Sequence, residues 1–504
     1  MRESKQPQSA RGPLRITVPS RADGFLRQFT AVIGGPLGRH SDPGRVNPGF
    51  FTVERVLILM TVAASLLMLL AKNPCRLNGW GGSNPYVYAC YSDWVPLFGA
   101  RGFAENPWVP FSAQAQFEYP VLMSAVASVV AWLVPEGAAN RSLVYFDMNL
   151  LLVAILWIVT VVCTLRMGGR RPWDAAMVAI APGIILAGSI NWDMWAVALL
   201  ALGMLSFARR YTVLAGILIG LGAAMKIYPF FVLGAVLVIA VRTGKLKPFW
   251  VTAGTATLTW ALVNLPYALA YPDSFKHFFA FSSERGAGFS SFWHVWNLLA
   301  GKSEVLEPVN AEQMSFWGLA IFFLCCAGIA VLGLAAQRTP RLGSLAFLIV
   351  ASFVMVNKVY SPQFVVWLIP LFALAMPRWR EFAIWMLVEV AHFYGLWFYL
   401  DSLDADDIHK VFPENGYIFL VLAHMLMLAY LMYLVARSVL DPRRDPIRAV
   451  GQDDPLAGPF AGVPDAFTLR GSRARGARNP QKEKEPVEST GHPEPASTTT
   501  GPTA

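Results

Sequence analysis

The residues best suited to chemistry lie in short polar segments between apolar runs. The first such segment, "ACYSDWVPLFGARGF" (89–103), places Asp93 beside Trp94 in a stretch too polar for a membrane span and too aromatic for a solvated linker. A carboxylate in such a position can take a proton from a hydroxyl group. Asp93 is therefore our candidate for a general base.

Later segments of the same kind supply further charged candidates. They are Glu118 in "FEYP", Asp193 in "SINWDMW", Lys226 in "GAAMKIYP", Arg285 and His294 in "SSERGAGFSSFWHVWN", and Lys358 in "NKVYSPQ". Carboxylates and cations together suit a displacement in which a carboxylate activates an acceptor hydroxyl while cations hold a phosphate that leaves. Transport is the alternative use of such charges, and it would favour positions near the bilayer midplane on broken helices.

Each of these residues also has a structural interpretation. Helix capping is the alternative for Asp93 and for Asp193, because both come just before a segment that can start a helix. Exposure to solvent or at the membrane interface is the alternative for the three cations and for Glu118. Packing is the alternative for His294.

The composition places the chain in a membrane. Of its 504 residues, 55% are hydrophobic and only 14% are charged, whereas a soluble domain carries about 25% charged residues. The net charge is +9, but the basic residues occur in the tails and short loops. This distribution is typical of topology control, and it offers no contiguous basic face for a nucleic acid.

The apolar runs predict an all-helical protein with about twelve spans and both termini in the cytoplasm. Basic clusters follow every second span, which marks the cytoplasmic side. One run, 121–134, breaks this alternation, and it is bounded by Pro120 and Pro135. We interpret this run as a helix that lies on or dips into the outer leaflet, so that the polar candidates gather on the external face. The runs counted as spans are 53–70, 143–165, 175–190, 194–207, 213–224, 230–241, 250–270, 316–335, 342–356, 364–375, 382–400 and 417–436.

The predicted organisation has three parts. Residues 1–50 form a basic, disordered cytoplasmic tail, and residues 51–438 form the transmembrane domain, with 71–141 as its first external loop. Residues 439–504 are rich in proline, glycine and charged residues, so we expect a second disordered cytoplasmic tail.

Four stretches, in order, resemble a known family. They are "YSDWVPLFGARGF" with "FEYP", "NWDMWAVALLALGMLSFARR", "AGILIGLGAAMKIYP" and "NKVYSPQFVVWLIPL". Over residues 53–436 the chain resembles the polyprenyl-phosphate-sugar-dependent glycosyltransferases of the GT-C type. It is most similar to glycosyltransferase family 87, which contains actinobacterial mannosyl- and arabinofuranosyltransferases of cell-envelope glycolipids.

The resemblance implies a GT-C fold with juxtamembrane helices in the first external loop. It implies that Asp93 acts as the base and that Lys226 contacts the donor phosphate. The remaining polar candidates are then expected around the substrates. The implied reaction moves a sugar, with mannose expected, from a polyprenyl phosphate to a glycolipid or lipoglycan with inversion, at the outer face of the plasma membrane. Arabinofuranose as the sugar is one alternative, and a transporter or flippase of a lipid-linked saccharide is another.

The sequence favours a lipid-linked donor and no cofactor. It has no glycine-rich nucleotide loop after a strand and no soluble domain that would bind a nucleotide sugar. It also lacks a Cys/His cluster at the spacing of metal ligands, so we expect no metal. Cys75 and Cys90 both fall in the first external loop, where an oxidising environment favours a disulfide just before Asp93.

Overall fold

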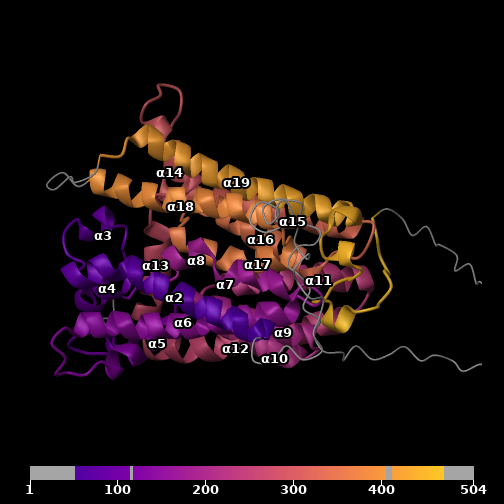
Figure 1. Ribbon diagram of the computed structural model, residues 1–504, viewed down its shortest axis with the longest axis horizontal. Helices are drawn as coiled ribbons and strands as arrows, with labels where there is room; N and C mark the ends of the chain where they lie inside the picture. The colour runs from indigo at the N-terminus through magenta and orange to yellow at the C-terminus, as the bar shows by residue number, and fades with distance from the viewer. Residues whose placement is uncertain (1–51, 114–116, 404–410, 470–504) are drawn as a thin grey trace, which may run out of the picture. The chain divides into compact units, whose positions relative to one another are not determined.

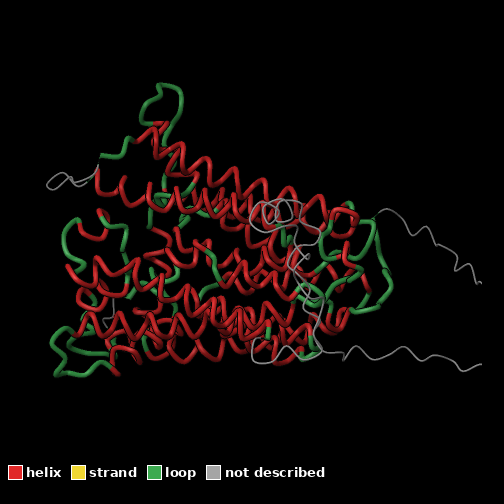
Figure 2. The backbone as a smooth tube through the Cα atoms, viewed as in Figure 1, coloured by secondary structure: helices red, strands yellow, loops and turns green. Residues whose placement is uncertain are grey.

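The computed structural model describes residues 52–113, 117–403 and 411–469. Within these ranges every regular element is a helix or a short 3-10 turn (Figures 1 and 2). The all-helical fold class predicted from the sequence is confirmed. The predicted tail segments 1–50 and 470–504 lie outside the described residues.

Five of the described helices are long and apolar enough to cross a membrane. They are α2 (Val53–Asn78), α6 (Arg141–Met167), α15 (Ala311–Ala335), α18 (Trp379–Ser402) and α19 (Glu414–Leu440). Several shorter apolar helices correspond to other predicted spans, and the count of about twelve stays a prediction. The helices that position the site are α9 (Asp193–Ala208), α10 (Thr212–Met225), α12 (Leu246–Ala270), α13 (Pro272–Glu284), α16 (Leu342–Val356) and α17 (Val365–Ala375).

Side-chain caps fix where three of the long helices begin. The side chain of Thr52 accepts a hydrogen bond from the backbone of α2, and that of Asn140 accepts one from the backbone of α6. Asn310 and Gln313 form a reciprocal capping box at the start of α15. These bonds satisfy backbone N–H groups that have no partner inside the helix.

The predicted span 175–190 is not one helix. It is divided into a 3-10 turn (Pro172–Ala175), α7 (Ala176–Ala179) and α8 (Pro182–Ala187). Pro182 explains the break, because proline has no N–H and its ring clashes with the preceding helical turn. The chain after α8 then leads Ile190 and Asn191 to the site described below.

The run 121–134 forms α5 (Val121–Leu133), a helix of 13 residues. At about 1.5 Å per residue it is shorter than the ~30 Å hydrocarbon core of a bilayer. It packs against α6, α10 and α12. These bounds agree with the predicted juxtamembrane helix, and its orientation to a bilayer stays a prediction.

Small residues let α10 pack closely between α9 and α12. A Cβ atom on Gly216 would lie 1.8 Å from Thr255 Oγ1, and one on Gly220 would lie 2.4 Å from the Ala256 carbonyl oxygen. A larger residue at either position would push the two helices apart. This contact fixes the end of α10, where Lys226 leaves the helix.

Residues 441–469, expected to be part of a disordered tail, instead pack against the helices (yellow in Figure 1). Ile447, Leu456 and Phe460 are buried there. Asp445 forms an ion pair of 2.6 Å with Arg341, whose side chain is 1% exposed. The composition of this segment did not predict its packing. The packing depends on arginines that lie elsewhere in the chain, in the predicted cytoplasmic clusters.

Candidate active site

A cavity of about 890 Å³ collects most of the residues selected from the sequence. Its lining combines these charged residues with several aromatic side chains. Asp193 lies behind the lining, and His294 lies outside it. The selected residues that line the cavity are Asp93, Glu118, Lys226, Arg285 and Lys358.

Asp93 is held by a small hydrogen-bond network. The hydroxyl of Tyr119 donates to Asp93 Oδ2 at 3.0 Å, and Asn191 Nδ2 donates to the same oxygen at 2.9 Å. Asn191 Nδ2 also donates to the hydroxyl oxygen of Tyr119 at 3.0 Å. The backbone N–H of Asp93 donates to the Ile190 carbonyl at 2.8 Å, which ties this loop to the segment after α8. The carboxylate is thus oriented from two directions.

The capping interpretation of Asp93 does not account for its side chain. Asp93 occupies the N-cap position of α4 (Trp94–Ala100), yet its side chain makes no capping hydrogen bond. The carboxylate is instead part of the network that faces the cavity. This leaves it able to accept a proton from a group bound there.

Burial raises the pKa of Asp93 above its ordinary value, while hydrogen bonds from Tyr91 and Tyr119 and the charge of Lys226 act in the opposite direction. A raised pKa makes the carboxylate a stronger base than a solvated one. Burial, and then the charge of Asp93, also raises the pKa of Tyr119. Tyr119 therefore stays a neutral hydrogen-bond donor at physiological pH.

Lys226 follows the last residue of α10 and pairs with Asp193. Its Nζ lies 3.1 Å from Asp193 Oδ1, and that oxygen also accepts a hydrogen bond of 2.7 Å from Trp367 Nε1. Asp193 is the first residue of α9 and the N-cap position belongs to Trp192, so Asp193 is not the cap proposed as its alternative. The pair holds the Lys226 ammonium group at the cavity wall.

Two further cations face the cavity from other loops. Lys358 Nζ donates to the Ser283 carbonyl at 2.8 Å and to Ser315 Oγ at 2.9 Å. Burial, followed by the positive charge of Arg285, lowers the pKa of Lys358. The repulsion between these two cations favours an anion near them.

Glu118 and His294 have clear local partners. Glu118 forms a two-pronged ion pair with Arg101, with Nε–Oε2 and Nη2–Oε1 distances of 2.9 Å each. The His294 ring packs against Phe289 and Tyr417, and burial lowers its pKa. These contacts favour the packing interpretation of His294, whereas Glu118 remains at the cavity edge.

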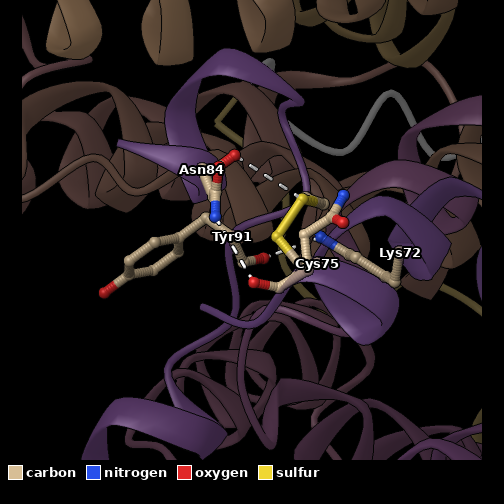
Figure 3. The surroundings of a disulfide bond; sticks show 6 residues. Lys72, Cys75, Asn84 and Tyr91 are labelled. Carbon is tan, nitrogen blue, oxygen red and sulfur yellow. Dashed lines mark hydrogen bonds between the residues drawn. A yellow bond between two sulfur atoms is a disulfide. The ribbon is translucent and has the colours of Figure 1, made fainter. Parts of the chain in front are cut away.

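A disulfide and a buried lysine attach the Asp93 loop to α2. Cys75 in α2 is bonded to Cys90, and Lys72 Nζ, one turn earlier, donates to the Tyr91 carbonyl at 2.7 Å (Figure 3). Both links end within three residues of Asp93. The sequence indicated the cysteine pair, but it did not identify Lys72, which lies near the end of an apolar helix.

A family model identifies the chain's relatives. The model of glycosyltransferase family 87 matches residues 117–357. The chain resembles glycosyltransferase family 87. This confirms the resemblance inferred from the motifs. The matched range contains Tyr119, Asn191 and Lys226, and Asp93 lies before it.

Three solved structures have a distant similarity to this chain. The oligosaccharyltransferase of Archaeoglobus fulgidus in its apo form is 16% identical, with a TM-score of 0.36, covering 76% of this chain and 55% of its own. ArnT from Cupriavidus metallidurans, bound to undecaprenyl phosphate, is 14% identical, with a TM-score of 0.41. The match covers 81% of this chain and 76% of ArnT. AglB from A. fulgidus, in complex with an inhibitory peptide and a dolichol-phosphate, is 14% identical, with a TM-score of 0.38, covering 76% and 55%. The chain thus spans about half the length of the oligosaccharyltransferases. No curated protein matches it.

Proposed function

We propose that this chain is an inverting membrane glycosyltransferase of the GT-C type. It transfers mannose from a polyprenyl phosphate to a glycolipid or lipoglycan. The observation that carries the proposal is the position of Asp93 and Lys226 on one cavity, inside a chain that resembles glycosyltransferase family 87. A base and a cation are the two groups that this chemistry needs.

In the proposed reaction Asp93 takes the proton of an acceptor hydroxyl. The oxygen attacks the anomeric carbon, and the bond between that carbon and the phosphate oxygen breaks. The phosphate leaves with the electron pair of the broken bond, and attack from the opposite face inverts the anomeric centre. Tyr119 and Asn191 orient the carboxylate through their bonds of 3.0 and 2.9 Å.

The cations of the cavity suit the leaving phosphate. Lys226, Arg285 and Lys358 reach the cavity from three different loops. Charge-assisted hydrogen bonds to a phosphate are stronger than neutral ones, and partial burial strengthens them further. Asp193 compensates the charge of Lys226 in the free protein and keeps its ammonium group in place.

The apolar part of the cavity supports a lipid-linked donor. Trp260, Tyr267, Phe275, Phe278 and Phe279 line it on α12 and α13. Their surfaces offer contact to the hydrocarbon next to a polyprenyl phosphate head group. A soluble nucleotide donor would leave this wall without a partner.

We place the cavity at the outer face of the plasma membrane, with both termini in the cytoplasm. The site residues lie before α9 and after α10 and α16, whereas arginines cluster at the opposite ends of these helices. Arginine and lysine favour the cytoplasmic side. The Cys75–Cys90 bond near the site fits an oxidising compartment.

The test uses purified full-length protein with three donors and a lipid extract. The donors are polyprenyl-phosphate mannose, polyprenyl-phosphate arabinofuranose and a nucleotide-activated mannose. We expect labelled mannose in a lipid product whose anomeric configuration is inverted. Transfer from the arabinofuranose donor alone would show that the sugar is arabinofuranose and not mannose. Movement of a donor across the membrane of a vesicle, without transfer of its sugar, would favour the flippase alternative.

A further inference from the structure

Three buried metal-ligating side chains gather on α18 and α19, outside the lining of the cavity. They are Glu389, His392 and His424, which are 5%, 1% and 0% exposed. One potential ligand atom from each lies within 4.8 Å of the other two. None of the three lines the cavity that holds Asp93.

The two helices present these groups to one another. Glu389 and His392 are three residues apart, so they share one face of α18. His424 comes from α19, which packs against α18 (Figure 1). A Glu-x-x-His pair that meets a ligand from a facing helix is an arrangement used by metal sites in helical bundles. Two imidazoles and one carboxylate are a ligand set for Zn²⁺.

Hydrogen bonds within the protein leave the cluster incomplete. Glu389 Oε1 accepts a bond of 2.9 Å from Trp385 Nε1 and lies 3.3 Å from His424 Nδ1. Among the described residues His392 Nε2 has no hydrogen-bond partner, although the side chain is buried. A buried polar atom without a partner destabilises the folded protein. A bound ion would supply the missing partner.

The two imidazole rings have to reorient before they can bind one ion. The imidazoles of His392 and His424 are stacked, with centroids 4.1 Å apart and planes 2° from parallel. Two ligands of one Zn²⁺ ion, each about 2.1 Å from it, lie at most about 4.2 Å apart. An imidazole nitrogen binds a metal in the plane of its ring, so at least one of the two parallel rings has to turn out of the stack for both to reach one ion.

We propose that Glu389, His392 and His424 bind one divalent transition-metal ion, with Zn²⁺ preferred. The ion ties α18 to α19 and has no part in sugar transfer, so this inference does not rest on the proposed function. It also braces the cavity wall, because His424 Nε2 lies 3.4 Å from the Ser290 carbonyl and the His424 ring packs 4.5 Å from that of Tyr360. Both Ser290 and Tyr360 line the cavity. No metal was expected from the sequence, because His424 lies on a different helix from Glu389 and His392 and no local spacing reveals the three residues as a set.

The test measures metal binding by the full-length protein, purified with an affinity tag that contains no histidine. The protein is stripped with a chelator and titrated with Co²⁺, whose visible absorption reports coordination, and with Zn²⁺, which is counted by mass spectrometry. We expect one equivalent bound, and at least about 100-fold weaker binding in Glu389→Gln and in His392→Ala, since even outer-shell changes cost 10–100-fold. The matched control His277→Ala, in α13, is expected to bind like the wild type.

Two results would overturn the proposal. If the stripped wild-type protein binds no Co²⁺ or Zn²⁺, the three residues form a hydrogen-bond cluster only. If Glu389→Gln and His392→Ala bind the ion like the wild type, the ion sits elsewhere. Should His392→Ala fail to fold, the nearly isosteric Glu389→Gln still decides. Thermal unfolding gives a second readout, because added Zn²⁺ should raise the midpoint of the wild type and leave that of Glu389→Gln unchanged.

Discussion

Replacing Tyr119 with phenylalanine should shift the pH dependence of transfer without disturbing the fold. The change removes the hydroxyl that donates to Asp93 Oδ2 at 3.0 Å and leaves the Asn191 bond of 2.9 Å in place. The lost bond stabilises the ionised carboxylate only. Its removal therefore raises the pKa of Asp93 beyond the increase that burial already causes.

The size of the effect follows from the strength of that bond. A hydrogen bond to a charged group contributes about 1.5–3 kcal/mol, which corresponds to a factor of about 10–150 in the proton affinity of the carboxylate. Because Asn191 still donates to the same oxygen, we expect the lower end, about 10-fold. A base works when ionised, so activity rises with pH through the pKa of Asp93. In Tyr119→Phe this rise should occur at higher pH.

The assay is the pH profile of kcat/KM for sugar transfer, measured for the wild type, for Tyr119→Phe and for the control Tyr88→Phe. Tyr88 is an exposed tyrosine of the same loop, and its variant should follow the wild-type curve. Tyr119→Phe should lose about 10-fold on the acidic limb and approach wild-type activity at high pH. An equal loss at every pH would show that Tyr119 does not act through Asp93, and the reasoning would fail.

Three other changes test the supports of the site. Replacing Cys75 and Cys90 with serine should lower the free energy of unfolding by about 3 kcal/mol, because the disulfide closes a loop of 15 residues. In a thermal melt, a reductant should reproduce this loss in the wild type and leave the variant unaffected. Lys226→Met should weaken donor binding about 10–100-fold, because a charge-assisted bond to phosphate is lost; an unchanged dissociation constant in a donor titration would rule out this contact. Arg341→Met leaves Asp445 buried without its partner, which should lower the free energy of unfolding by about 3–5 kcal/mol. Denaturant unfolding measures this loss, and the added change Asp445→Leu should recover part of it.

The sequence predicted the parts of the site that depend on local chemistry. Asp93 and Lys226 lie in short polar segments between apolar runs, and this placement marked them as candidates. The helical class followed from the length and composition of those runs. Both predictions rest on patterns that a single segment contains.

The residues missed are those whose roles depend on distant segments. Tyr119 and Asn191 stood inside the quoted motifs, but only the folded chain brings them to one carboxylate oxygen. Lys72 lies in α2, and its partner is a carbonyl of the following loop. The same reason explains why residues 441–469 were expected to be disordered, because their partners lie at the ends of other helices.

The most direct test of the account compares the wild type with Asp93→Asn in transfer and in stability. Burial raises the pKa of Asp93, so the folded protein binds this proton more tightly than the unfolded chain does. The contribution of this group to stability is therefore largest at low pH and falls as the pH rises through the raised pKa. Asparagine carries no charge to desolvate, so the variant should unfold at the wild-type temperature or above it at neutral pH.

The account predicts that Asp93→Asn loses about 10²–10⁴-fold in transfer rate, the usual contribution of a general base, while its thermal midpoint does not fall. Transfer at the wild-type rate by the folded variant would contradict it. So would a loss of activity that only accompanies unfolding, because Asp93 would then stabilise the loop and not take the proton.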